Sequence, residues 1–247
     1  MNPFIRAISV ALLAACALAP AAQAAVLVGG TRVVLNAKQG ETTLRLSNDS
    51  ASPALVQAWI DRGDAQSTPD SADSPFLITP PMFRIEPKRD QNLRILYTRE
   101  PLPVDRESLF WLNVLEVPPK PTGPEAEGKN ILQLAVRSRL KLFFRPDGLQ
   151  ADPLKAPAAL TFHTVADKGG TVLVVRNPTP YHVTLADAAL DAGGKTWKAE
   201  AGMVAPMSEL RLPLAGLSSP APAGTPVRFS AINDFGATAA FTGVVAP

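Results

Sequence analysis

The chain has 247 residues, 24 Lys and Arg against 22 Asp and Glu, and a single cysteine. This near-neutral balance argues against nucleic acid as a general partner, because nucleic-acid-binding domains carry a marked excess of Lys and Arg. One cysteine cannot form an intrachain disulfide, so hydrophobic cores alone must hold the fold together.

The first 24 residues have the pattern of a secretory signal peptide. Arg6 precedes an apolar run over residues 7–19, and the motif AQA at 22–24 is a small-x-small cleavage site. Cleavage there would begin the mature chain at Ala25 and implies export. A second reading stays open, because LAAC, ending at Cys16, is similar to a bacterial lipobox and would leave a lipid on that cysteine. No later segment is long and apolar enough to span a bilayer.

Short runs of β-forming residues separated by turns follow, and the 25 prolines argue against long helices. The expected strands of the first half cover residues 31–36, 41–48, 54–61, 76–78, 84–87, 91–97 and 108–117, followed by the stretch 131–146. We predict an edge position for 76–78, a hairpin of 84–87 with 91–97, and a central position for 108–117, which is dense in β-formers. Residues 118–129, PPKPTGPEAEGK, predict a loop.

The turn residues Arg145-Pro146-Asp147-Gly148 predict a boundary between domains at 25–146 and 147–247. The expected strands beyond it cover residues 160–165, 171–177, 182–187, 209–214, 227–232 and 239–244. About seven short strands per half is typical of an immunoglobulin-like sandwich. We therefore predict an all-β chain of two such β-sandwich domains.

The stretch 131–146, ILQLAVRSRLKLFFRP, combines alternating apolar residues with cations at every second position: Arg137, Arg139 and Lys141. Periodicity alone would place Leu132, Leu134 and Val136 in the core. For Arg137 and Arg139, the residues favour charges on an edge strand that block unwanted pairing. Arg32, in an earlier strand, would by itself be read as a cation on a solvated face.

Five motifs occur together and cover both halves of the chain. They are GTRVVL at 30–35, LPVDRESLFWLNVLEVPP at 102–119, NILQLAVRSRLKLFFRP at 130–146, NPTPYHVTL at 177–185 and INDFG at 232–236. In this order and spacing they resemble the periplasmic pilus (fimbrial) chaperones, the PapD-like family. The resemblance implies two sandwiches in a boomerang arrangement and a chaperone that caps pilus subunits by donating a strand. It further implies delivery of those subunits to an outer-membrane usher, and leaves self-association of the free protein through its donor strand open.

The resemblance also implies roles for individual residues. Arg32 and Lys141 would clamp the C-terminal carboxylate of a subunit, since both are cationic donors. The alternating apolar residues of the donor strand would be Leu132, Leu134 and Val136. A charge network joining the two domains would consist of Glu107, Arg145 and Asp234.

Lys141 and the donor residues implied by the resemblance have sequence positions of opposite parity. Lys141 is odd-numbered and the donor residues are even-numbered, so a regular strand puts them on opposite faces. Either a bulge or strong twist intervenes, or the clamp and the donor residues use different faces. The moderate length of the loop before this strand and the lack of cysteines resemble the short-loop branch of the family. His182 and Ala237 replace an aromatic residue and a glycine that are usual there.

An enzyme is not expected. His163 and His182 are the only histidines, no cysteine remains after cleavage, and Ser108 lacks a nucleophile-elbow context. We interpret both histidines as surface or structural residues and predict no cofactor, nucleotide or metal. The alternative function is a secreted two-domain β-sandwich acting as an adhesin or structural pilus protein. Two complete domains without an unpaired N-terminal donor segment argue against it.

Overall fold

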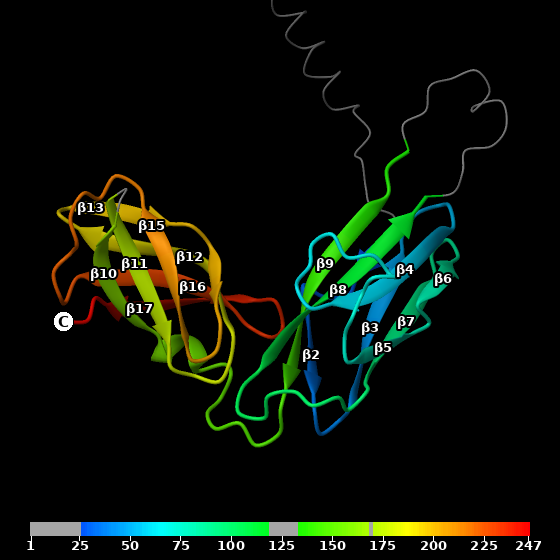
Figure 1. Ribbon diagram of the computed structural model, residues 1–247. Helices are drawn as coiled ribbons and strands as arrows, with labels where there is room; N and C mark the ends of the chain where they lie inside the picture. The colour runs from blue at the N-terminus through cyan, green and yellow to red at the C-terminus, as the bar shows by residue number, and fades with distance from the viewer. Residues whose placement is uncertain (1–25, 119–132, 168–169) are drawn as a thin grey trace, which may run out of the picture.

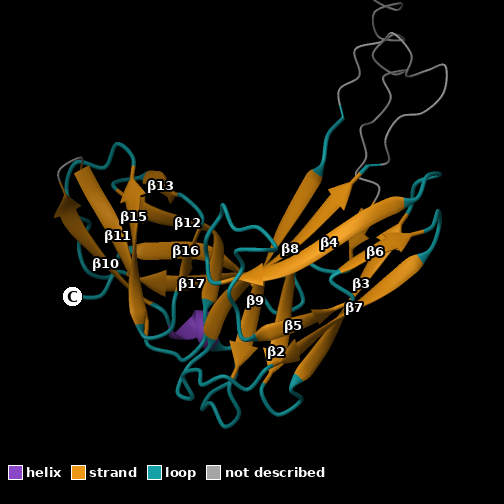
Figure 2. Ribbon diagram, turned by 45° about the vertical axis from the view of Figure 1, so that its right-hand side comes forward, coloured by secondary structure: helices purple, strands orange, loops and turns teal. Residues whose placement is uncertain are grey.

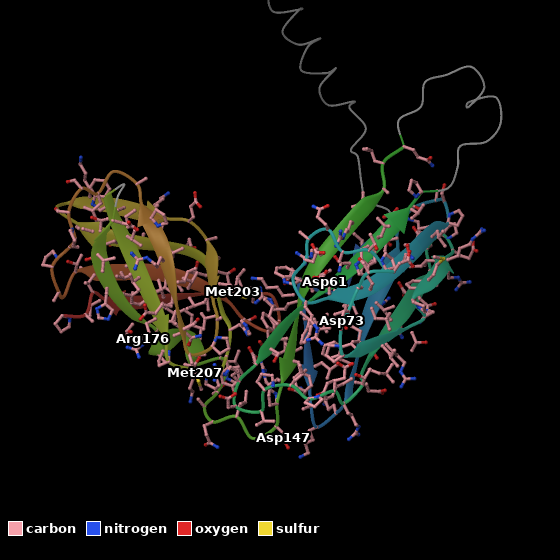
Figure 3. The ribbon with its side chains drawn as sticks, viewed as in Figure 1. Asp61, Asp73, Asp147, Arg176, Met203 and Met207 are labelled. Atoms are coloured by element: carbon pink, nitrogen blue, oxygen red, sulfur yellow. The ribbon has the colours of Figure 1, made fainter. Side chains whose placement is uncertain are left out.

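The computed structural model describes residues 26–118, 133–167 and 170–247. The predicted signal peptide, the lipobox-like motif, nearly all of the predicted 118–129 loop, and Leu132 lie outside the described residues. Two β-sandwiches meet at an angle, with Asp147 at the bend between them (Figures 1 and 3). The predicted all-β class with two immunoglobulin-like sandwiches is confirmed.

The first sandwich has a four-stranded and a five-stranded sheet (Figure 2). In spatial order, the first sheet contains β1 (Val26–Val28), β3 (Glu41–Asn48), β7 (Asp90–Tyr97) and β5 (Phe76–Thr79). The second contains β2 (Arg32–Asn36), β9 (Val136–Arg145), β8 (Ser108–Val117), β4 (Ala54–Asp61) and β6 (Met82–Ile85). The edge position of β5 and the central position of β8 are as predicted.

The second sandwich follows a similar plan. Its three-stranded sheet contains β10 (Thr161–Asp167), β11 (Gly170–Asn177) and β15 (Ser208–Leu214). The other sheet contains β13 (Lys195–Ala199), β12 (Val183–Ala192), β16 (Pro226–Ile232) and β17 (Thr238–Val244), with β14 (Gly202–Val204) also paired to β12. A short 3-10 helix, η1 (Ala156–Ala159), precedes β10. No helix in the described parts of the chain is long and apolar enough to cross a membrane.

The predicted hairpin of 84–87 with 91–97 is wrong. β6 pairs with β4, whereas β7 pairs with β3 and β5 in the opposite sheet. Ile85 and Leu93 both reach the same core, one from each sheet. Two alternating strands joined by a short connection can therefore lie in opposite sheets of a sandwich as well as form a hairpin in one sheet. A hydrogen bond stabilises this connection, because the Lys88 amide donates to the Asn48 carbonyl at 2.8 Å.

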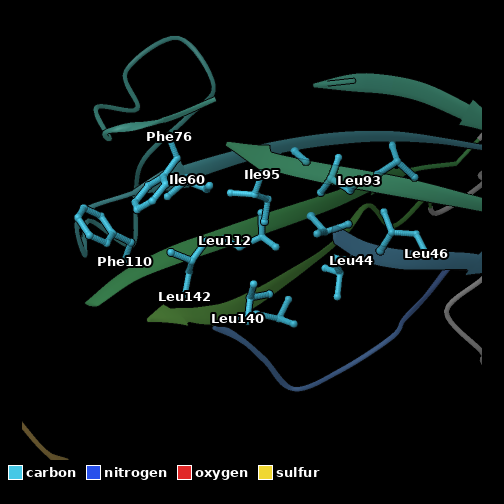
Figure 4. Close-up of a cluster of buried hydrophobic side chains, with 14 of the residues drawn as sticks. Leu44, Leu46, Ile60, Phe76, Leu93, Ile95, Phe110, Leu112, Leu140 and Leu142 are labelled. Carbon is cyan, nitrogen blue, oxygen red and sulfur yellow. The ribbon is translucent and has the colours of Figure 1, made fainter. Parts of the chain in front are cut away.

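Each sandwich has its own hydrophobic core. Figure 4 shows the first, to which β3 contributes Leu44 and Leu46 from one sheet and β9 contributes Leu140 and Leu142 from the other. Leu46 and Leu142 are fully buried. Burying a leucine side chain contributes about 1.5–3 kcal/mol, so these alternating positions determine which face of each strand points inward.

The first two strands belong to different sheets. β1 pairs antiparallel with β3, and β2 then pairs parallel with β9. Gly29 lies at the change of sheet, where its amide donates to the Arg45 carbonyl at 2.9 Å. A Cβ atom at Gly29 would lie 2.8 Å from that oxygen, so only glycine fits this approach without displacement.

Candidate functional site

Arg145 joins the two sandwiches through two carboxylates. Its Nε donates to Oε1 of Glu107 at 2.8 Å, and its Nη1 donates to Oδ2 of Asp234 at 2.8 Å. The Glu107 side chain is only 2% exposed. Burial alone would lower the pKa of Arg145, but the hydrogen bonds and charges of Asp234 and Glu107 raise it overall. All three residues of the predicted network therefore lie in direct contact, and Arg145 is firmly charged.

His182 also contacts the Glu107 carboxylate. Oε2 of Glu107 accepts the His182 backbone N–H at 2.8 Å and lies 3.2 Å from Nδ1 of the ring. The ring packs against Phe143, with centroids 5.3 Å apart. Here a residue from the second sandwich satisfies a carboxylate of the first. The departure from the usual aromatic residue at 182 thus adds a polar contact at the junction.

Arg32 and Lys141 are directly opposite each other in the parallel pair of β2 and β9. Arg32 Nη1 donates to the Ile232 carbonyl at 3.0 Å, and Lys141 Nζ donates to Thr184 Oγ1 at 3.2 Å. Both partners belong to the second sandwich. The two cations therefore lie side by side where the sandwiches meet, and each is oriented by a neutral oxygen.

The electrostatic environment of these two cations is unfavourable. Burial lowers the pKa of Arg32 although the charge of Asp234 opposes the shift, and burial together with the charge of Arg32 lowers the pKa of Lys141. Within the described residues neither cation forms an ion pair with a carboxylate. Two adjacent, partly desolvated cations form a site that would be stabilised by an anion, and a carboxylate matches both donors.

The N-terminal half of β9 has a free edge. β8 pairs with β9 from Val136 to Phe144, but β2 covers only Lys141–Arg145. Val136, the first residue of this free half, is 42% exposed, and Leu134, in the segment that leads into β9, is 68% exposed. The interpretation of these residues as core is therefore wrong, because the sandwich ends before it can cover them.

The β8–β9 register has no shift, so no bulge separates Lys141 from Val136. Leu140, Leu142 and Phe144 face the core, and the odd-numbered Lys141 lies on the outer face. Lys141 and Val136 thus lie on opposite faces of β9. For these two residues the structure excludes a bulge and agrees with the second of the two explanations left open by the sequence.

Family models match most of the chain. Residues 25–150 match the model described as "Pili and flagellar-assembly chaperone, PapD N-terminal domain", and residues 155–242 match "Pili assembly chaperone PapD, C-terminal domain". The chain belongs to the PapD family of pilus-assembly chaperones.

Individual proteins agree with this assignment. The chain is 47% identical to "Chaperone protein FimB/FhaD" of Bordetella pertussis, with 98% of this chain and 96% of the relative covered. It is 44% identical to "Probable fimbrial chaperone YadV" of Escherichia coli K12, covering 85% and 86%. The crystal structure of YadV superimposes with a TM-score of 0.76 at 40% identity, covering 90% of this chain and all of that one.

One of the structures similar to this chain is a chaperone–pilin complex. A structure described as Salmonella enterica SafA pilin in complex with the SafB chaperone matches with a TM-score of 0.74 at 31% identity. The match covers 92% of this chain and 99% of the other.

Arg137 and Arg139 have contacts that the sequence did not indicate. They lie on the free-edge half of β9, and their side chains are only 27% and 23% exposed. Both contact Asp61, at 4.0 and 2.7 Å, and Asp61 itself was not identified as important. A signal was available: an acidic residue at the end of a buried strand has to find a cationic or hydrogen-bonding partner.

Proposed function

We propose that this PapD-family chaperone binds pilus subunits in the periplasm and caps them by donating the free half of β9. The observation that carries the proposal is the exposure of Val136 on the edge of β9 that β2 leaves unpaired, together with the exposure of Leu134 just before that strand. A subunit strand added there would complete the ladder with backbone hydrogen bonds and bury the alternating side chains. Leu132 is proposed to extend the same series.

In this proposal the subunit's C-terminal carboxylate binds Arg32 and Lys141. The support is their cross-strand pairing and their partial desolvation without a carboxylate partner among the described residues. The clamp would set the register of the subunit strand on β9, because a terminal carboxylate fixes one end of the ladder. Glu107, Arg145 and Asp234 are proposed to hold the two sandwiches so that the clamp persists.

Export, domain boundaries and the fate of loaded and free molecules are also proposed. Residues 1–24 would act as a cleaved signal for export, with domains at 25–146 and 147–247. Loaded subunits would pass to an outer-membrane usher, and free molecules would shield their donor edges by pairing with each other. No catalytic step, nucleotide, metal or nucleic acid takes part.

Co-expression in a periplasm with a pilus subunit from the same genome tests the proposal. The wild type should co-purify with the subunit, and Arg32→Ala and Lys141→Ala should each lose most of it. Circular dichroism shows whether each variant is folded. If the folded clamp variants retain as much subunit as the wild type, the carboxylate site is assigned to the wrong residues.

Subunit affinity should fall as pH rises towards the ordinary Lys141 pKa of 10.5. A bound carboxylate favours the ammonium form, so binding weakens, by up to about tenfold per pH unit, once free Lys141 loses its proton. Because the pKa of free Lys141 is lowered, this weakening should begin below pH 10.5. The stability of the free protein has the opposite sign, since the penalty for burying the ammonium is relieved as pH rises through the lowered pKa.

The matched control for this pH dependence is Lys141→Arg. Its guanidinium stays protonated over the whole range, so its affinity should remain level while that of the wild type falls. Calorimetric titration from pH 7 to 10 measures both curves. Parallel curves for the two proteins would show that Lys141 does not contact the carboxylate.

A further inference from the structure

The donor half of β9 has support from only one neighbouring strand. Between Val136 and Leu140, β8 forms the ladder on one side and no strand of the described residues pairs on the other. The side chains of Leu134 and Val136 are largely exposed and contribute little packing. A strand segment held by a single ladder frays readily, and a frayed segment must be ordered again before it can bind.

The opposite face of the same segment is held by a buried carboxylate. The Asp61 side chain, at the end of β4 (Figure 3), is 3% exposed. It accepts hydrogen bonds from Asn113 Nδ2 at 2.7 Å, Ser67 Oγ at 2.9 Å, the Gly63 amide at 2.7 Å and Arg139 Nη2 at 2.7 Å. Burial raises the pKa of this carboxyl, but the hydrogen bonds together lower it below its ordinary value. Asp61 is therefore ionised at neutral pH.

Arg137 connects β9 to the same cluster by a second route. Its Nε and Nη2 both donate to Asn113 Oδ1, at 2.9 and 2.6 Å, and its Nη1 donates to the Ala65 carbonyl at 3.1 Å. Ser67 Oγ in turn accepts from Trp59 Nε1 at 3.1 Å. The loop after β4 is thus bonded to β9 over the outer face of the sheet.

Two tryptophans complete the arrangement. The Arg137 guanidinium lies 4.8 Å from the centre of the Trp59 ring, and that of Arg139 lies 4.4 Å from the Trp111 ring. Both distances are within the range of cation–π attraction, which strengthens when the cation is partly desolvated. Arg137 and Arg139 are therefore held by charge, by hydrogen bonds and by stacking at once.

We propose that Asp61, Asn113, Arg137 and Arg139, with Trp59 and Trp111, are positioning residues that keep the donor half of β9 extended while its edge is unoccupied. We call this cluster the Asp61 network. It rests on the proposed function, because it matters for binding only if that edge receives a subunit strand. It lies on the face of β9 opposite Val136, so its proposed role is to hold the strand and not to supply the apolar side chains that a subunit would bury. Its effect is to maintain the binding-competent conformation, and apparent affinity scales with the population of that conformation.

Asp61→Asn tests the network, with Asp191→Asn as the matched control. Asp191 accepts two hydrogen bonds from Arg228, at 2.7 and 2.8 Å, on the exposed surface of the second sandwich. Hydrogen exchange should quicken by about tenfold or more over residues 136–140 in Asp61→Asn, with residues 141–145 unchanged. Affinity for a pilus subunit should fall by the same factor, because only the ordered fraction binds. Asp191→Asn should match the wild type in both measurements.

Wild-type exchange over residues 136–140 in Asp61→Asn would overturn the proposal, and so would faster exchange with unchanged affinity. If Asp61→Asn unfolds, exchange will also quicken in β3 and β7, and Arg137→Lys then replaces it. Arg137→Lys keeps the positive charge but loses the two hydrogen bonds that the guanidinium donates to Asn113. Faster local exchange and lower subunit affinity are expected in this variant too. Failure of wild-type protein to bind any subunit, with local exchange still faster in the variant, would refute the proposed function and leave the ordering role standing.

Discussion

Leu134→Glu is expected to abolish capture of pilus subunits and to leave the free protein as stable as the wild type. Leu134 is 68% exposed, so a charge there changes the free energy of unfolding by no more than about 0.5 kcal/mol. In the complex the same side chain would be buried. Losing it costs about 1.5–3 kcal/mol, and burying an unpaired carboxylate in its place adds several kcal/mol. Affinity should fall by roughly 100-fold or more.

Leu77→Glu is the matched control for this prediction. Leu77 is 63% exposed and lies on β5, the edge strand of the opposite sheet. The Leu77→Glu substitution introduces the same charge at a similarly exposed position, but away from β9. Both variants should unfold at the wild-type temperature, and only Leu134→Glu should lose the subunit in surface-based binding measurements. Equal binding by the two variants would mean that the subunit uses another surface.

Arg145→Met should lower the free energy of unfolding by about 3–5 kcal/mol, because it leaves the buried carboxylate of Glu107 without its cation. Glu107 is 2% exposed, and His182 alone would remain to satisfy it. Asp234 also loses its bidentate partner at the junction. We therefore expect a weaker contact between the two sandwiches as well as a less stable protein.

Urea unfolding and small-angle X-ray scattering measure the two consequences separately. Arg228→Met is the control, since Arg228 forms a comparable bidentate pair with Asp191 but is 58% exposed. It should alter neither the unfolding midpoint nor the radius of gyration appreciably, because exposed pairs contribute little. A full loss of stability in Arg228→Met, or none in Arg145→Met, would contradict the assignment of the junction to Arg145.

Local patterns were sufficient for much of the fold and insufficient where distant chain segments meet. Alternation identified β3 and β9, and the density of β-forming residues identified β8, because side-chain period and β-propensity are local properties. Leu134 was ambiguous for a physical reason: alternation shows which face a side chain uses but not how far the opposing sheet extends. Asp61 was missed because its partners, Arg137 and Arg139, lie more than 70 positions further along the chain.

The change of sheet between β1 and β2 explains why β9 has an edge to offer. With Arg32 opposite Lys141, the register offset is 109, so a straight continuation of β2 would place Val28 opposite Arg137. The chain's own N-terminal strand would then occupy the donor edge as an intramolecular competitor. A tethered competitor acts at an effective concentration that a diffusing partner rarely reaches. Because β1 pairs with β3 after the change of sheet at Gly29, this competition would not arise if the edge of β9 receives a subunit strand as proposed.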